Sequence, residues 1–192
     1  MAVRPVTLED IVGRDRYEAI RDERRRGIIA LKKRRRVEVG ANVLFVFENT
    51  DTVLFQIQEM LRAESITDLD GIRAEIETYN ALLPAPGELS ATMLIELADP
   101  KTVREELPLW YGIDRCVRLE VGDHAVAAVF EGGRSREDKV SAVQYVRFPI
   151  GRDGGRQLQA APVRLVIDHA HYRATTELTP EARAELATDL AG

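Results

Sequence analysis

The spacing of apolar residues changes from a helical period in the first half of the chain to a period of two in the second half. In the first half, apolar residues recur every three or four positions, which is typical of amphipathic helices. The pattern predicts helices at about 14–36, at about 52–64, and from a cap at Ser65 or Thr67 to about residue 83. Between the first two helices, 43–47 is entirely apolar, which predicts a strand that is buried on both faces.

Alternation of apolar and polar residues predicts a set of strands in the second half. Their expected ranges are 88–97, 140–149, 163–168 and 172–178. A hairpin is expected where 117–121 and 126–130 flank Gly122-Asp123. The elements between them are a short helix near 100–110, a glycine-rich charged loop at 131–139, and a last helix that starts at Thr179-Pro180.

Segregation of helices and strands along a chain favours the α+β class. We therefore expect a mainly antiparallel sheet or sandwich in the C-terminal half. Helices of the N-terminal half and a C-terminal helix should pack against it. Residues 1–192 are expected to form one domain, in which the helical residues 1–36 either join the main body or protrude as an N-terminal arm.

Composition limits the functions that are open to this chain. With 45% hydrophobic residues, the chain should fold into a globular structure. Its net charge of −5 argues against general nucleic-acid binding. Its only cysteine, Cys116, excludes an internal disulfide and an iron–sulfur cluster held by this chain alone. No apolar run reaches membrane-spanning length, and the N-terminus lacks a secretory signal, so we expect the cytoplasm.

Positive charge is concentrated in the first predicted helix. Five cations fall within about a quarter of its circumference, beside the apolar stripe; they are Arg14, Arg21, Arg25, Lys32 and Arg36. This stripe either binds an acidic partner, a phosphate group or RNA, or is a solvated face neutralised by nearby acids. No aromatic residue is interleaved with it, which weighs against nucleic acid.

Polar residues on the next two helices form a second candidate site. Its members are Glu48 just before the second predicted helix, Gln56 and Glu59 on that helix, Glu77 and Asn80 on the third, and Tyr172 in a motif quoted below. Glu59 and Glu77, with His169, offer the carboxylate and imidazole ligands that suit iron, manganese or zinc. The alternative is a buried ion-pair network with arginines, because no Glu-x-x-His pair is present.

Several longer motifs resemble one bacterial family that is known only as a domain of unknown function. The motifs are FENTDTV at 47–53, QIQEMLR at 56–62, RRR at 24–26, TYN at 78–80 and DHAHY at 168–172. The resemblance covers nearly the whole chain. It implies a gene neighbourhood of rubrerythrin-like and heterodisulfide-reductase-like iron–sulfur proteins, and hence redox or oxidative-stress metabolism. The family pattern His-Pro-x-Tyr is His169-Ala170-His171-Tyr172 here, which makes a metal site that needs both histidines doubtful.

The sequence fixes no reaction, because Walker, Gly-x-Gly-x-x-Gly, Gly-x-Ser-x-Gly and Cys-x-x-Cys motifs are all absent. Whether the protein is an enzyme therefore stays open. Our first hypothesis is an accessory or binding protein of a redox system that docks an acidic or iron–sulfur protein partner. The second is a metal-dependent enzyme that uses the carboxylates and histidine above. A homo-oligomer is compatible with either hypothesis.

Overall fold

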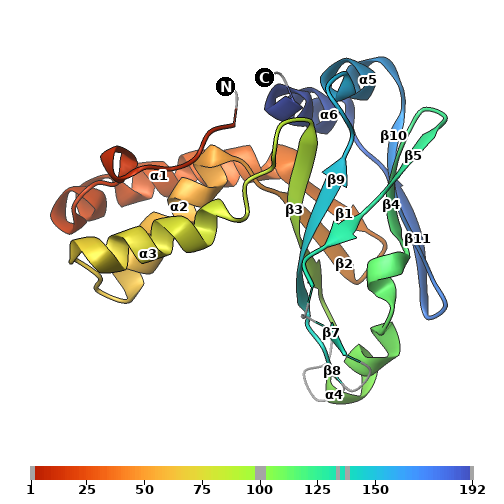
Figure 1. Cartoon of the computed structure of the whole chain (residues 1–192), viewed down its shortest axis with the longest axis horizontal. Coiled ribbons are helices and arrows are strands. Elements are labelled where there is room, and N and C mark those ends of the chain that lie inside the picture. Colours follow the sequence, from red (N-terminus) through yellow and green to blue (C-terminus); the bar gives the residue numbers. More distant parts are fainter. Residues whose placement is uncertain (1–2, 98–102, 133–134, 137–138, 191–192) are drawn as a thin grey trace.

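The computed structural model describes residues 3–97, 103–132, 135–136 and 139–190. Figure 1 shows two sheets stacked face to face and three helices that extend away from them as an arm. Every strand pair among these described residues is antiparallel. The expected α+β class with antiparallel sheets is therefore confirmed.

The first sheet has the strand order β1-β2-β3-β9-β6. Its strands are β1 (Arg36–Val39), β2 (Val43–Phe47), β3 (Glu88–Ile95), β9 (Val143–Pro149) and β6 (Val129–Phe130). The second sheet has the order β11-β10-β4-β5. It consists of β11 (Tyr172–Glu177), β10 (Val163–His169), β4 (Val117–Val121) and β5 (His124–Ala127). β4 and β5 form the expected hairpin, with Val121 opposite His124.

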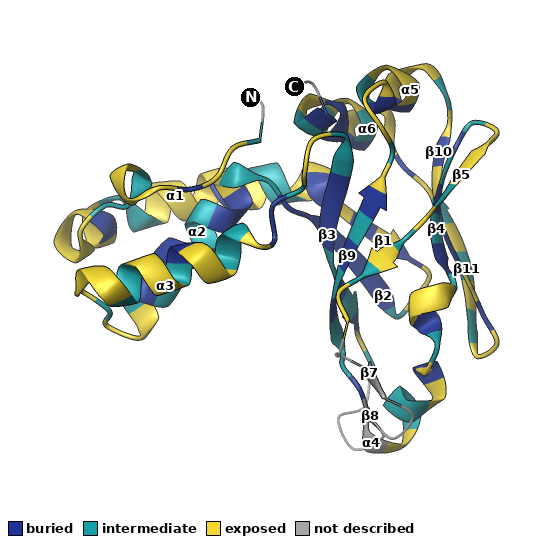
Figure 2. Cartoon of the chain, viewed as in Figure 1, coloured by how far each residue is buried: buried dark blue, intermediate teal, exposed yellow. Residues whose placement is uncertain are grey.

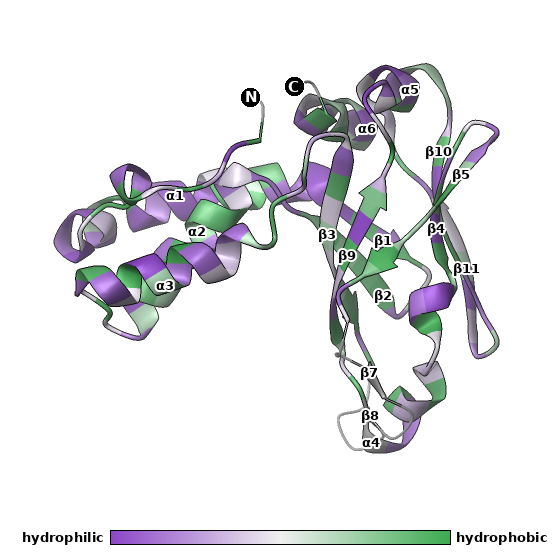
Figure 3. Cartoon of the chain, in the orientation of Figure 1, coloured by the Kyte–Doolittle hydropathy of each residue, from purple (hydrophilic) through white to green (hydrophobic). Residues whose placement is uncertain are grey.

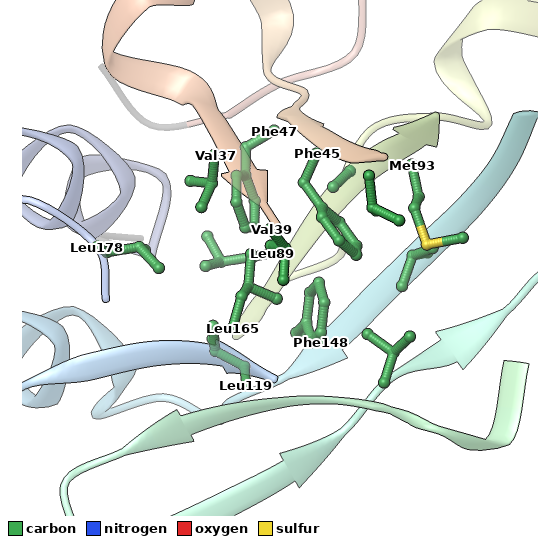
Figure 4. Packing of buried hydrophobic residues seen from close by; sticks show 14 of the residues in the cluster. Val37, Val39, Phe45, Phe47, Leu89, Met93, Leu119, Phe148, Leu165 and Leu178 are labelled. Atoms are coloured by element: carbon green, nitrogen blue, oxygen red, sulfur yellow. The ribbon is translucent and has the colours of Figure 1, made fainter. Parts of the chain in front are cut away.

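Inward-facing side chains of both sheets form the main core. Phe148 of β9 packs between Phe45 and Phe47 of β2, at ring-centroid distances of 6.3 and 6.1 Å. Leu119 and Leu165 approach them from the second sheet (Figure 4). All five residues of β2 are buried, as expected for its unbroken apolar run.

The arm consists of α1 (Arg14–Arg35), α2 (Thr50–Ala63), α3 (Leu69–Asn80) and the 3-10 turn η1 (Leu8–Asp10). It has a smaller apolar core of its own, which includes Val6, Val53, Ile57, Leu61 and Ile76. α1 continues directly into β1, so the longest helix connects the two parts. Figure 2 shows that most of the outer face of the arm is exposed.

Short helices close both ends of the sandwich (Figure 1). One end carries α5 (Gly154–Ala160), α6 (Pro180–Ala187) and η4 (Thr188–Leu190). Nearer the other end are the short helices α4 (Val103–Glu106), η2 (Leu107–Trp110) and η3 (Ile113–Arg115). The strand pair β7 (Ser135–Arg136) and β8 (Lys139–Val140) is also near that end. Among the described residues, none of the helices has the length and apolarity needed to cross a bilayer.

Some sequence expectations were wrong in detail. Asp68 caps α3, where Ser65 or Thr67 was expected, and its side chain accepts a hydrogen bond from the Gly71 N–H. α5 was missed, because Gly154-Gly155 is typical of a turn. In place of the helix expected near 100–110, the structure has the one-turn helix α4 followed by the 3-10 turn η2. Residues 100–102 of the expected range lie outside the described residues. The loop expected at 131–139 contains the short β7–β8 pair, although 133–134 and 137–138 are not described.

Candidate partner-binding site

The contact between α1 and α2 is centred on Glu59. Arg21 donates two hydrogen bonds to this carboxylate, from Nε to Oε1 at 2.8 Å and from Nη2 to Oε2 at 2.7 Å. The Tyr17 hydroxyl donates a third bond to Oε1 at 2.8 Å. These bonds, the Arg21 bond above all, lower the pKa of Glu59 to about 2. Glu59 is therefore an ionised partner of arginine, as in the ion-pair alternative.

The three proposed metal ligands do not meet. Glu59 is engaged by α1, while Glu77 lies exposed on α3. His169 ends β10 in the second sheet, far from the arm (Figure 1). Within the described part of the chain, no three His, Cys, Asp or Glu side chains are placed to hold a metal ion. A shared site of Glu59, Glu77 and His169 is thus wrong on geometric grounds.

Glu48 lies at the junction between the arm and the first sheet. It is buried, and its carboxylate accepts hydrogen bonds from the Thr52 hydroxyl at 2.5 Å, the Thr92 hydroxyl at 2.7 Å and the Gln56 amide at 3.1 Å. Thr52 and Gln56 belong to α2, and Thr92 belongs to β3. Glu48 and Gln56 therefore have a structural role, in which they connect the arm to the first sheet. A buried carboxylate needs such hydrogen-bond donors to offset its loss of hydration.

Two side-chain amides fix the segment that precedes α1. Asn80 accepts from the Val6 N–H and donates to the Val6 carbonyl, both at 2.9 Å. Gln58 does the same for Val12, at 2.9 and 3.3 Å. Each amide replaces the pair of hydrogen bonds that a neighbouring strand would offer. Asn80 therefore holds the arm together, and its place in a polar site with Glu59 is not supported.

Tyr172 joins the two sheets, and His169 bonds to the segment that follows η2. The Tyr172 hydroxyl donates to the Val39 carbonyl at 2.6 Å and accepts from the Asn42 N–H at 3.0 Å. His169 Nδ1 lies 3.3 Å from the His171 N–H, so Nε2 carries the proton that reaches the Tyr111 carbonyl at 3.0 Å. His169 and His171 flank the β10–β11 turn and do not lie side by side on one strand. Both ring nitrogens of His169 are occupied.

Cys116 is partly buried and its thiol donates to the Gly112 carbonyl at 3.4 Å. Burial raises the pKa of this thiol, and the nearby Asp168 and Asp114 carboxylates add to the shift. A thiol that stays protonated is a poor nucleophile. This environment is that of an unreactive packing residue.

The residue that anchors α1 to the sandwich was missed by the sequence analysis. Arg35 has no exposed side-chain surface, and it donates to the carbonyls of Phe47 at 2.9 Å and Glu48 at 3.2 Å. Its guanidinium also pairs with Glu185 and Asp189 at the C-terminal end of the fold. The sequence offers five consecutive cations at 32–36, and no local pattern distinguishes the buried one.

The predicted basic stripe divides into a structural part and a free part. Arg14 donates to the Ser65 hydroxyl in the α2–α3 turn, and Arg21 pairs with Glu59 of α2, so both are engaged within the arm. Arg25 and Arg36 are exposed and Lys32 is partly exposed, and none of the three forms an ion pair within the described residues. α1 has ten Lys or Arg residues and only four Asp or Glu residues, and its outer face is strongly hydrophilic (Figure 3).

A groove of about 720 Å³ runs beside this helix, between α1, α2 and the segment that precedes α1. Leu31, Leu54 and Phe55 contribute its apolar lining, and Arg24 and Arg26 contribute cations. Gly27 also lines it, and a Cβ atom added there would meet nothing within 4 Å. Close packing therefore does not explain the glycine at position 27.

These features define a two-sheet α+β protein with a cationic helical arm, whose polar clusters are occupied by internal bonds. The chain belongs to the family described as Protein of unknown function (DUF3501), whose model matches residues 5–190. This confirms the expected membership of a family of unknown function.

The fold is shared with a solved structure. A crystal structure of a novel protein of unknown function from Burkholderia pseudomallei is 35% identical and has a TM-score of 0.90. The alignment covers 97% of this chain and 100% of that one. Curated proteins include no match to this chain.

Proposed function

We propose that this protein is an accessory protein that docks an acidic protein partner through the exposed face of α1. One observation carries the proposal: Arg25 and Lys32 have no carboxylate partner in the described structure, whereas the anchoring cations Arg21 and Arg35 do. Unpaired surface cations attract an acidic surface and accelerate association with it.

The setting of this interaction is a further part of the proposal. The motif resemblance, with its iron–sulfur gene neighbours, supports a bacterial redox or oxidative-stress system and an acidic or iron–sulfur partner. A single cysteine supports a reducing compartment such as the cytoplasm. A catalytic role for the carboxylates has less support, because Glu48 and Glu59 are both occupied by internal donors.

Affinity capture from the native cell, with three forms of the protein, tests the docking face. We expect wild type to retain an acidic protein at low salt and to release it at high salt, because exposed charges are screened. The Arg25→Glu/Lys32→Glu variant should lose this partner. Recovery of the same proteins by that variant would sink the proposal.

The matched control is Arg115→Glu/Arg152→Glu, which has the same net charge. Both of its arginines are exposed, and neither has an ion pair in the described structure. They lie on the sandwich, away from α1. The control should retain the partner, which would separate a local effect of the α1 face from an effect of total charge.

A further inference from the structure

Ile29 is an exposed aliphatic side chain in the middle of the cationic helix. Its exposed fraction is 49%, whereas that of the adjacent Ile28, which lines the groove between α1 and α2, is 8%. One exposed isoleucine is ordinary on a protein surface. The residues around it are what distinguish this one.

On an α-helix, the surface neighbours of a residue are those three and four positions away. For Ile29 these are Arg25, Arg26, Lys32 and Lys33, so all four neighbours are cations. None of the four forms an ion pair within the described residues. We call Ile29 with these four residues the cationic ring. Along this face of α1, the acid that precedes the ring is Asp22, seven positions before Ile29.

We infer that the cationic ring is the contact point for an acidic amphipathic helix of a partner protein, whose central aliphatic side chain packs on Ile29. Carboxylates around that side chain would pair with the ring. This inference rests on the proposed function and adds the chemistry of the partner. An apolar centre surrounded by polar contacts that exclude water is the usual anatomy of an energetically important interface residue.

Other anionic partners fit the cationic ring less well. A membrane-binding helix needs a broad exposed apolar face, but in the apolar stripe of α1 Tyr17 and Ile28 are buried and Ile20 and Leu31 are partly buried. A nucleic acid would place phosphates against the aliphatic centre, and the ring has no aromatic residue on which a base could stack.

Two synthetic helical peptides test the inference by fluorescence anisotropy. One has a leucine with glutamates three and four positions to either side, and in the other serine replaces the leucine. We expect wild type to bind the leucine peptide about five- to tenfold more tightly, as burial of one aliphatic side chain allows. Added salt should weaken both complexes but preserve their ratio, because the apolar contact is not screened.

Ile29→Ala should bring the two affinities together without weakening the helix, because alanine favours helix more than isoleucine does. Leu109→Ala is the matched control, since Leu109 is 50% exposed on the sandwich, and it should leave the ratio unchanged. Equal affinities for wild type, or an unchanged ratio in Ile29→Ala, would overturn the inference.

Two further measurements separate this inference from the proposed function. Arg25→Glu/Lys32→Glu should lose both peptides at low salt; if it does while wild type shows no leucine preference, docking by charge stands and the role of Ile29 fails. If wild type floats with phosphatidylserine vesicles and Ile29→Ala does not, the face is a membrane contact and the inference is overturned.

Discussion

At the scale of single residues, internal hydrogen bonds explain most of the polar side chains that the sequence marked as candidates. Glu59 is the clearest case, because three donors from α1 surround it. Such charge-assisted bonds are stronger than neutral ones, and they favour the ionised carboxylate. Glu59 therefore stabilises the contact between α1 and α2.

Replacing Glu59 by Gln should lower the free energy of unfolding by about 1–2 kcal/mol at neutral pH, since water screens a pair that is about a quarter exposed. The folded-state pKa of about 2 lies below the ordinary value of 4.5. The stabilisation is therefore complete above 4.5 and is lost as the pH falls through 2. Urea unfolding of both proteins across this range measures the difference.

Glu77→Gln provides the control for this experiment. Glu77 is exposed on α3 and has no hydrogen bond or ion pair in the described structure. Its replacement should leave stability unchanged. Equal stability of wild type and Glu59→Gln at neutral pH would contradict the ion-pair assignment, and metal analysis of the purified proteins would then become the next measurement.

At the scale of elements, α1 combines an anchoring end, a free cationic face and a glycine without a packing role. Gly27 lies in the helix interior, where a glycine costs about 0.5–1 kcal/mol relative to alanine. Gly27→Ala should therefore raise the free energy of unfolding by about that amount, because the added Cβ meets nothing within 4 Å. Thermal unfolding followed by circular dichroism measures the gain.

Gly40→Ala is the contrasting variant. Gly40 has a φ of +68°, and its added Cβ would clash with the ring and hydroxyl of Tyr172. This substitution should destabilise the protein. A loss of stability in Gly27→Ala as well would mean that the centre of α1 is more crowded than the structure indicates.

The elements that the sequence predicted well are those whose signals are local. The apolar run of β2 and the hairpin turn at Gly122-Asp123 depend on neighbours within a few positions, and both are confirmed. α5 could not be predicted, because its two glycines are needed for close packing that is partly distant in sequence. A Cβ on Gly154 would come within 2.7 Å of Ile150 and 3.1 Å of Leu190, and one on Gly155 within 3.1 Å of the Ala187 carbonyl.

Pairing over long sequence distances explains the missed site residues in the same way. Arg21 belonged to the predicted docking stripe because the helix period places it beside Arg25. Its partner Glu59 is 38 positions away, and only the packing of α1 on α2 brings the two together. Four of the five predicted cations lie on α1, and Arg36 begins β1. Only the structure divides them into anchors and free cations.

At the scale of the whole molecule, one buried arginine determines how the arm meets the sandwich. Arg35→Met should cost about 3–5 kcal/mol of stability, because it leaves the buried carboxylate of Asp189 without its cation. The double variant Arg35→Met/Asp189→Leu should cost less than the sum of its single changes. Chemical unfolding of all four proteins gives the coupling energy.

Arg34→Met serves as the control on the adjacent position. Arg34 pairs with Glu185 at 2.9 Å, but its side chain is 46% exposed, so the loss should stay below about 1 kcal/mol. If Arg34→Met and Arg35→Met were equally destabilising, the anchor would be the whole cationic segment and not the buried guanidinium.

The position of this anchor along the chain has a consequence for synthesis on the ribosome. Arg35 and Asp189 are 154 positions apart, whereas the three helices of the arm lie within residues 14–80, and α2 contacts both α1 and α3. Contacts that are local in sequence form early, and distant ones wait for their second partner. The arm should thus be the first part of the nascent chain to fold. The connection at residues 35–36 should remain mobile and accessible to proteases until residue 189 has left the exit tunnel. Asp189 can then pair with Arg35 and fix the arm to the sandwich.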